Sequence, residues 1–291
     1  MKDVEYFTPE TLDEAAALLL AVDGQAAPMA EGTNLIAEVQ EGQRTLSMVL
    51  DMQRIPELNR LEYDERNGLR IGAAVPFATI LEFPPVRRLY PMLADGSIPS
   101  FPNGTLDRAT LGGNLRQAPP SVEMAPPLIC LRASAAVFGP HGWSELAVEA
   151  LFPAARRRVL QPGEFLVDLR LPAPLPRSNG AYLRAHLREK VGSTTAGIAV
   201  FLVMEQDLLT CCGARVTLCG VTPTPMRALE AERFLSGRCL EEAVVREAGA
   251  LVAGSAGPIA RPAADRLEPV KELTHRAIVE AMKRVRTDAT T

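Results

Sequence analysis

Two glycine-containing loops, far apart in the sequence, constrain the fold more than any other feature of this chain. One reads Ala30-Glu31-Gly32-Thr33-Asn34, and the other reads Thr110-Leu111-Gly112-Gly113-Asn114. Glycine has no Cβ, so it adopts positive φ readily and leaves its N–H group unshielded. Consecutive N–H groups can form a concave nest that suits a phosphate. Two such nests could bind the two phosphates of one dinucleotide; the alternative is a pair of ordinary glycine turns.

The N-terminal third has the pattern of a small α/β unit. Thr11 and Glu14 form the signature of a capping box, and apolar residues then recur at helical spacing up to Gly24. A short strand over about 28–30 leads into the first loop, with a short helix after it. A buried strand is expected over 48–52.

A second unit is expected to begin near Leu69. Its predicted strands cover 69–73, 135–138 and 165–171, and a further strand over 145–148 returns antiparallel to that at 135–138. Short helices are expected at about 78–83 and 124–132. The proline pair at 84–85 should break the first of these helices.

The proline-rich stretch 171–176 is the best candidate for a linker. Beyond it, three strands are predicted over 181–187, 197–204 and 214–219. Three helices follow, near 227–235, 240–252 and 268–286, and the last carries an apolar stripe typical of a core or an interface. We therefore predict a domain over 1–175, with lobes of about 1–60 and 61–175, and a compact α+β domain over 176–291.

Composition narrows the function. A chain of 291 residues with 47% hydrophobic residues can build a sizeable core, and a net charge of −4 without a long basic run argues against nucleic acid as a partner. The acidic start and the short apolar runs indicate neither a signal peptide nor a membrane span. We therefore expect a cytoplasmic protein.

Few side chains in the sequence suggest catalysis or metal binding. The five cysteines form no C-x-x-C pair, and they suit a reducing compartment as small core residues. His141, His186 and His275 form no zinc motif, and each fits a structural or exposed position better than a catalytic one. We predict no catalytic residue and no metal ligand in this chain.

At its second loop the chain resembles the FAD-binding (medium) subunit of the molybdenum hydroxylases, a family that includes the carbon monoxide dehydrogenase and xanthine dehydrogenase types. The family's loops look like A-G-G-T-x-L and T-[IL]-G-G-N, and Gly220–Ala228 is similar to the family's G-V-x-P-x-P-x-R-A. The resemblance covers nearly the whole chain. It implies an α+β fold: a two-lobed FAD-binding domain like that of p-cresol methylhydroxylase, and then a smaller domain with a three-stranded antiparallel sheet and helices.

The resemblance also implies which residues bind FAD. The two loops would hold the pyrophosphate, Glu123 would bind hydroxyls near the adenine-side ribose, Leu166 would contact adenine, and Arg184 would lie near the pyrimidine edge of the flavin. The full set is Pro28, Met29, Ala30, Glu31, Gly32, Thr33, Asn34, Leu35, Thr110, Leu111, Gly112, Gly113, Asn114, Glu123, Leu166 and Arg184.

Several positions depart from the family pattern. Glu31 stands where the first loop usually has a glycine, Ser193 stands where many relatives have Asp, and Ser97–Asp107 lacks the usual I-x-S-x-Q-I-R-N. A carboxylate beside a phosphate is repulsive unless it points away. These departures keep open a different function, that of a structural subunit that has lost FAD.

The function implied by the resemblance is electron transfer. An FAD-carrying subunit of a heterotrimeric molybdenum hydroxylase would work beside a molybdopterin-binding large subunit and a [2Fe-2S] small subunit, in a dimer of heterotrimers. Electrons would pass to an acceptor such as NAD, oxygen or a quinone. A free-standing flavin reductase is a further alternative, although the chain offers it no evident acid or base.

Overall fold

The computed structural model describes residues 4–22, 25–30, 32, 35, 39, 42, 45–97, 104–116, 124–153, 159–188, 193–256 and 267–289. These residues form two compact units. Unit 1 takes its residues from Met1–Pro84, Phe101–Gln117 and Ala133–Pro172, and unit 2 from Pro85–Ser100, Ala118–Arg132 and Ala173–Thr291. Two short stretches of the predicted N-terminal domain therefore belong to unit 2. The predicted domain boundary near residue 175 stays a prediction.

A three-stranded parallel sheet opens unit 1. Its order is β1-β3-β2, with bounds β1 Glu5–Phe7, β2 Ala26–Met29 and β3 Met48–Asp51. Helix α1, Leu12–Ala21, packs on this sheet and buries Leu12, Ala15, Ala16 and Leu19. The predicted cap is confirmed, because Thr11 Oγ1 accepts a hydrogen bond from the Glu14 N–H. The helix ends at Ala21, and Gly24 lies outside the described residues.

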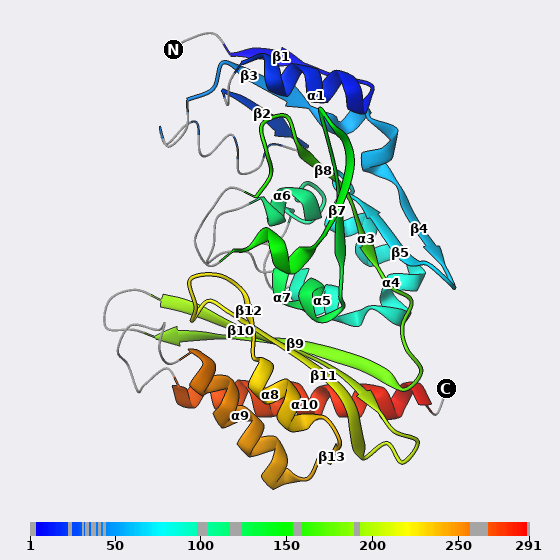
Figure 1. Cartoon of the computed structure of the whole chain (residues 1–291), viewed down its shortest axis with the longest axis vertical. Helices are drawn as coiled ribbons and strands as arrows, with labels where there is room; N and C mark the ends of the chain where they lie inside the picture. The colour runs from blue at the N-terminus through cyan, green and yellow to red at the C-terminus, as the bar shows by residue number, and fades with distance from the viewer. Residues whose placement is uncertain are drawn as a thin grey trace. The chain divides into compact units, whose positions relative to one another are not determined.

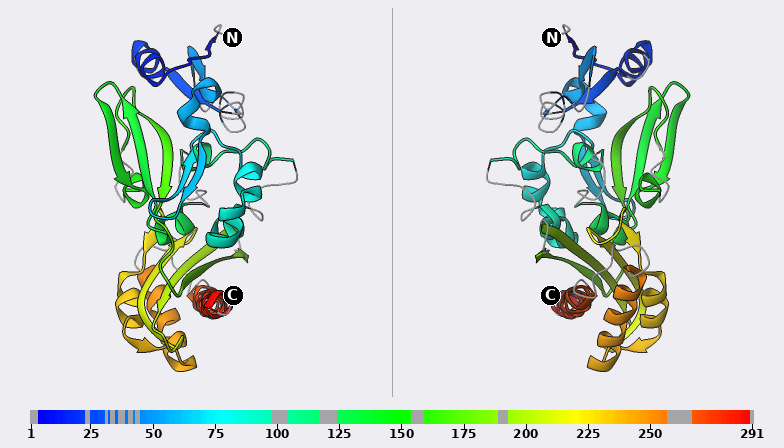
Figure 2. Two further views of the ribbon diagram at one scale, coloured as in Figure 1. Left: turned by 90° about the vertical axis from the view of Figure 1, so that its right-hand side faces the viewer. Right: turned by 90° about the vertical axis from the view of Figure 1, so that its left-hand side faces the viewer.

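A five-stranded antiparallel sheet forms the rest of unit 1. Its order is β4-β5-β8-β6-β7, with bounds β4 Leu61–Asp64, β5 Gly68–Gly72, β6 Ser134–Gly139, β7 Gly142–Ala147 and β8 Phe165–Leu171. The β6–β7 hairpin is a long twisted ribbon, green in Figure 2. Short helices join these strands: η1 Met52–Arg54, η2 Pro56–Asn59, α3 Phe77–Glu82, α6 Leu111–Leu115 and η3 Val148–Leu151.

Unit 2 contains a second five-stranded antiparallel sheet. The three predicted strands are present as β9 Ser178–Arg188, β10 Ser193–Met204 and β11 Thr210–Cys219. Two short strands that the sequence pattern missed, β12 Met226–Arg227 and β13 Arg238–Cys239, both pair with β11. The α+β class expected from the sequence is therefore confirmed, with a wider sheet than expected.

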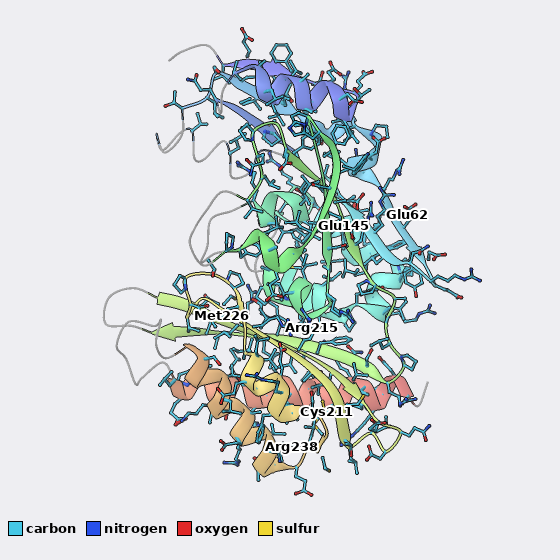
Figure 3. The ribbon with its side chains drawn as sticks, viewed as in Figure 1. Glu62, Glu145, Cys211, Arg215, Met226 and Arg238 are labelled. Atoms are coloured by element: carbon cyan, nitrogen blue, oxygen red, sulfur yellow. The ribbon has the colours of Figure 1, made fainter. Side chains whose placement is uncertain are left out.

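Helices cover both faces of this sheet. On one face lie α8 Leu229–Leu235, α9 Glu242–Ala256 and α10 Leu267–Ala289 (Figure 1). The apolar stripe of α10 is buried in the core, as its spacing predicted. On the other face, α5 Pro91–Ser97 and α7 Ala125–Cys130 contact β9, β10 and β11. Arg215 of β11 (Figure 3) helps to fix α7, because its Nε donates to the Ile129 carbonyl at 3.1 Å.

The proline pair at 84–85 begins a helix instead of only ending one. Helix α3 stops at Glu82, and α4 runs over Pro84–Leu89. Proline suits the first turn of a helix, because its missing N–H would have no intrahelical partner there. Among the described residues, no helix is both long enough and apolar enough to cross a membrane.

Candidate functional site

A pocket of about 570 Å³ in unit 1 is the candidate site. Ligand pockets typically enclose about 300–1,000 Å³. Its walls come from α1, β2, η1, η2, α6, the segment that follows β5, the turn before β8 and β8 itself. Seven predicted residues line it: Pro28, Met29, Ala30, Thr110, Gly112, Gly113 and Leu166. The pocket therefore includes Ala30 of the first loop together with Thr110, Gly112 and Gly113 of the second.

The second loop is the start of a helix, so the prediction of a positive-φ nest there was wrong. Gly112 and Gly113 lie within α6, and neither has positive φ. Thr110 is the N-cap, with φ −115° and ψ 155°, and its Oγ1 accepts from the Gly113 N–H at 3.1 Å. A threonine side chain at this position satisfies one of the open N–H groups of the first turn. The motif therefore forms a capped helix, which the run of two glycines did not reveal.

Gly112 allows α6 to approach the segment after β5 closely. Its N–H donates to the Ala73 carbonyl at 3.2 Å. A Cβ at residue 112 would lie 2.7 Å from both the Cβ and the carbonyl oxygen of Ala73. Glycine is therefore required here for packing, and Ala73 itself lines the pocket.

The first loop does contain a residue with positive φ. Gly32 has φ +74° and is buried. The loop follows β2, and the Ala30 carbonyl accepts a hydrogen bond from Gln53 Nε2 at 2.9 Å. Leu35 is buried in a small cluster with Ala27 and Leu46. Glu31, Thr33 and Asn34 lie outside the described residues, so their predicted contacts stay predictions.

The remaining predicted residues are dispersed. Leu111 and Asn114 are buried residues of α6 and are not among the residues that line the pocket. Arg184 lies on β9 of unit 2, and Glu123 lies outside the described residues. Their roles toward a ligand stay predictions.

Sequence reasoning missed two charged residues that line the pocket, Arg116 and Glu164. Arg116 is the C-cap of α6, and Glu164 belongs to the turn before β8. Gly163 in this turn has φ +82°, a backbone conformation that favours glycine. A Cβ at residue 163 would also lie 2.7 Å from Leu20 Cγ. The Pro162-Gly163-Glu164 sequence signals a turn, but nothing local says that this turn faces the glycine motifs.

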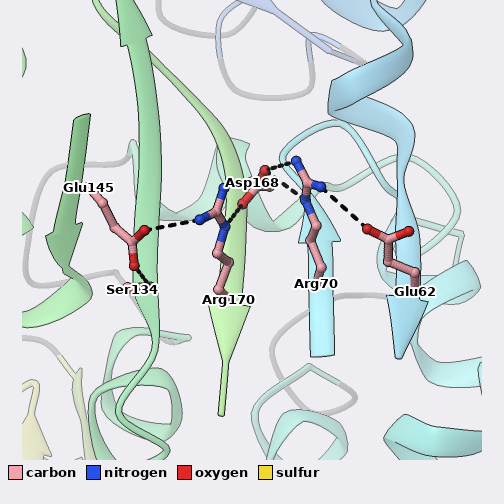
Figure 4. A network of polar contacts seen from close by, with 6 residues as sticks. All are labelled: Glu62, Arg70, Ser134, Glu145, Asp168 and Arg170. Atoms are coloured by element: carbon pink, nitrogen blue, oxygen red, sulfur yellow. Dashed lines mark hydrogen bonds and ion pairs between the residues drawn. The ribbon is translucent and has the colours of Figure 1, made fainter. Parts of the chain in front are cut away.

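A network of ion pairs lies on the five-stranded sheet of unit 1 and is centred on Asp168 of β8 (Figure 4). The fully buried Asp168 carboxylate accepts from Arg70 Nε and Nη2 at 2.9 and 2.6 Å, and from Arg170 Nε at 2.9 Å. Glu62 and Glu145 (Figure 3) bind the outer sides of the two arginines. Such pairing is the usual condition for burying a carboxylate, so we assign this network a structural role.

The pocket offers binding groups without an evident acid–base pair. Its described lining is mainly apolar, with one hydroxyl, one guanidinium and one carboxylate. No cluster of metal-binding side chains occurs among the residues that the structure describes. Such a site can hold and orient a ligand, and a redox cofactor would bring its own chemistry.

Comparison with known proteins gives matches along most of the chain. A family model described as the FAD binding domain in molybdopterin dehydrogenase matches residues 2–174, and one described as the CO dehydrogenase flavoprotein C-terminal domain matches residues 182–283. The chain is 29% identical to the carbon monoxide dehydrogenase medium chain of Afipia carboxidovorans, over 94% of this chain and 92% of that relative. It is 28% identical to caffeine dehydrogenase subunit beta of a Pseudomonas species, over 80% and 78% of the two chains. A chain from the crystal structure of a cyanide-inactivated Cu,Mo-CO dehydrogenase superimposes with a TM-score of 0.85 at 26% identity, over 97% and 98% of the two chains.

Proposed function

We propose, since this chain belongs to the family of FAD-binding subunits of molybdopterin dehydrogenases, that it is the electron-transfer subunit of a heterotrimeric molybdenum hydroxylase. Electrons would reach it from iron–sulfur clusters of a partner subunit and leave to an acceptor such as NAD, oxygen or a quinone. The observation that supports this proposal is that one pocket is lined by Ala30 of the first loop and by Thr110, Gly112 and Gly113 of the second.

The residues of the pocket suit FAD. Apolar side chains from β2, α6 and β8 would provide surfaces for its rings, and Gly112 allows α6 to pack closely against Ala73 in the wall of the pocket. When bound, FAD would supply the redox chemistry, because it can accept and donate electrons singly or in pairs. The chain's own task is to bind the cofactor, orient it and exclude water around it.

The partners are proposed from the relatives. One relative is named as a medium chain, and a solved neighbour is described as a Cu,Mo enzyme. We propose a molybdopterin-binding large subunit and a [2Fe-2S] small subunit as partners, a dimer of heterotrimers and a cytoplasmic location. Within this chain, Glu123 would bind ribose hydroxyls and Arg184 would lie near the pyrimidine edge of the flavin, where a cation stabilises negative charge.

The test is to measure the cofactor content of the purified full-length chain. We expect a flavin absorbance spectrum and, after acid release and chromatography, close to one FAD per chain. A folded chain that holds no FAD, even after incubation with excess FAD, would overturn the proposal and favour a structural subunit. Iron and molybdenum in the complex purified with this chain would test the proposed partners separately.

A further inference from the structure

The side chain of Gln53 holds the start of the first glycine loop. The parallel pairing of β2 with β3 ends at Met29 and Asp51, so the carbonyl of Ala30, the next residue, lies beyond the ladder. Gln53 Nε2 donates to this carbonyl at 2.9 Å, and Ala30 lines the pocket. A side-chain amide therefore takes the place of a strand at the point where the chain leaves β2 and enters the loop.

The backbone of Gln53 is itself held on both sides. Gln53 lies in η1, and its N–H donates to Oδ1 of the N-cap Asp51 at 3.1 Å. The other carboxylate oxygen of Asp51 accepts from the Tyr6 hydroxyl at 2.7 Å. Asn59 Nδ2 donates to the Gln53 carbonyl at 2.8 Å. The amide that binds Ala30 therefore extends from a fixed base, and this base connects β1, β3 and η2 to the loop.

The hydrogen bond to Ala30 constrains the path of the loop. A peptide unit is planar, so a carbonyl that is held by Gln53 fixes the plane through which the chain leaves β2. Gly32 follows two residues later and is buried with φ +74°, a conformation that favours glycine. Met52, the neighbour of Gln53, is buried and lines the same pocket. Helix η1 thus contributes both to the wall of the pocket and to the anchor of the loop.

We propose that Gln53 is a positioning residue for FAD, and that its amide holds the first loop in the conformation that binds the pyrophosphate. The inference rests on the proposed function, and Gln53 is not among the residues that the resemblance assigns to FAD. Glutamine suits the role because its amide nitrogen donates, whereas a carboxylate of the same length only accepts. A loop that is held in place before binding loses less conformational freedom when the ligand arrives.

The test measures the Kd of the full chain, freed of bound nucleotide, for FAD and for ADP, which carries the same diphosphate. Gln53→Met removes the donor at similar side-chain length, and Gln53→Glu replaces it with an acceptor. The matched control is Gln25→Glu, the same change at an exposed glutamine directly before β2.

Trp143, the single tryptophan, offers an intrinsic signal for the titration. Its ring lies 5.3 Å from that of Phe138, which lies 6.3 Å from that of Phe165, a residue that lines the pocket. Flavins absorb where tryptophan emits, so bound FAD should quench Trp143. The Kd for ADP is measured by displacement of FAD.

We expect Gln53→Met to raise the Kd for FAD and for ADP by similar factors, roughly 3- to 10-fold, the net worth of one hydrogen bond. A loop that adopts the binding conformation only part of the time raises the apparent Kd by the inverse of that fraction. At neutral pH Gln53→Glu should bind at least as weakly, because its carboxylate repels the Ala30 carbonyl oxygen. Gln25→Glu should bind as the native chain does.

The pH dependence of Gln53→Glu separates positioning from a general structural role. A protonated carboxyl can donate to the Ala30 carbonyl, as the native amide does. The ratio of the Kd of this variant to the native Kd should therefore fall toward one between about pH 8 and about pH 5, as the pH approaches the ordinary glutamate pKa of about 4.3. The charged groups near Gln53, which are Asp51 and the Arg54–Glu10 ion pair, are the same in both chains. Gln53→Met should show no such recovery.

Three outcomes would overturn the inference. Native affinity of both Gln53 variants at neutral pH would show that the amide does not position the loop. A Gln53→Glu variant that stays equally weak down to about pH 5 would show that donation to Ala30 is not the property that matters. An equal loss in Gln25→Glu would assign the effect to added charge.

The proposed function is tested separately by the native chain. A native chain that binds neither FAD nor ADP would remove the proposed function as well, whereas native binding with unaffected Gln53 variants would remove this inference alone. If Gln53→Met does not fold, the pH dependence of Gln53→Glu still decides.

Discussion

The guanidinium of Arg284 on α10 binds both carboxylate oxygens of Asp95 on α5, with Nη1–Oδ2 and Nη2–Oδ1 distances of 2.7 and 3.1 Å. The pair lies beside β9, an edge strand of the sheet of unit 2. Arg284 also donates to the Gly180 carbonyl at 3.0 Å, and Asp95 accepts from the Tyr182 N–H at 3.1 Å. Two side chains thus take up backbone groups that an edge strand would otherwise offer to another chain.

Removing this pair should destabilise the protein. Both side chains are less than a quarter exposed, at 23% and 19%. Arg284→Met leaves the Asp95 carboxylate and the Gly180 carbonyl without this partner, so we expect the free energy of unfolding to fall by about 2–4 kcal/mol. Urea denaturation measures the change, and light scattering should show increased self-association. Arg276→Met, on the exposed side of the same helix, is the control. Equal stability of the two variants would contradict the role assigned to the pair.

Gly112→Ala should damage both packing and cofactor binding. The added Cβ would meet the backbone and side chain of Ala73 at 2.7 Å, and relieving such overpacking typically costs about 1–3 kcal/mol. Because α6 must shift, FAD content should fall as well. Gly254→Ala is the control: its Cβ would meet nothing within 4 Å in α9, so alanine's helix propensity should make it neutral or slightly stabilising. Normal FAD content and stability of Gly112→Ala would disprove the close-approach argument.

The cysteines should divide into reactive and inert thiols. Burial raises the pKa of Cys130 to about 12 and that of Cys211 to about 11, whereas Cys212 and Cys239 are exposed. Since the thiolate is the reactive form, a thiol reagent at neutral pH should label Cys212 and Cys239 in the native chain. All five cysteines should react after unfolding. Mass spectrometry of the labelled peptides measures this, and fast native labelling of Cys130 would refute the burial.

The same pKa shifts predict a loss of stability at alkaline pH. The pKa values of Cys130 and Cys211 are higher in the folded than in the unfolded chain, so the unfolded state loses these protons first. Their contribution is complete below the ordinary thiol pKa of 9.0 and falls as the pH rises toward about 11 and 12. Cys130→Ala should therefore flatten this alkaline decline relative to Cys239→Ala. The free energy of unfolding of each variant is measured by urea denaturation from pH 8 upward. An equally steep decline with pH in both variants would contradict this prediction.

Glu242 should make the contact between α9 and α10 sensitive to acid. His275 Nε2 lies 3.0 and 3.2 Å from the Glu242 carboxylate oxygens. The hydrogen bond with His275 is the larger cause that lowers the Glu242 pKa, and the hydrogen bond from Arg246 is the second. A lowered folded-state pKa contributes stability above the ordinary value of 4.5, and the contribution is lost as the pH falls through the folded value. Glu242→Gln should therefore be less stable than the native chain near neutral pH and equal to it in acid. Glu247→Gln, an exposed change on the same helix, should track the native chain throughout.

Local signals in the sequence were sufficient for many of the elements. The Thr11 cap, the apolar stripe of α10 and the three long strands of unit 2 each depend on residues within a few positions of one another, so periodicity and capping chemistry reveal them. The short strands β1 and β4 were missed because their burial patterns are eee and ieie, which give little apolar signal. The two-residue strands β12 and β13 are defined by pairing with β11 and have no sequence signature of their own.

The candidate site divides in the same way. The glycine motifs and Leu166 were found from the sequence by resemblance, and the structure brings residues of both motifs and Leu166 to one pocket. Arg116 was missed because it follows the second motif without belonging to it, and Glu164 was missed because its turn signal does not reveal that the turn faces the pocket. The sequence also did not reveal that Gly112 and Gly113 are helical, because glycine is compatible with both a nest and a helix. The close contact of Gly112 with Ala73 favours the helix.

By itself, the sequence determined the helices with strong apolar stripes, the Thr11 cap and the two motifs of the pocket, because each depends on residues close together in the chain, and its resemblance to a family determined the fold class. The tertiary structure alone decided the strand order β4-β5-β8-β6-β7, the place of α5 and α7 on the second sheet, and the partners of Asp168 and Arg284. These features join residues far apart in the chain. Which distant groups meet depends on how all the apolar faces are buried together, and no local pattern encodes that choice.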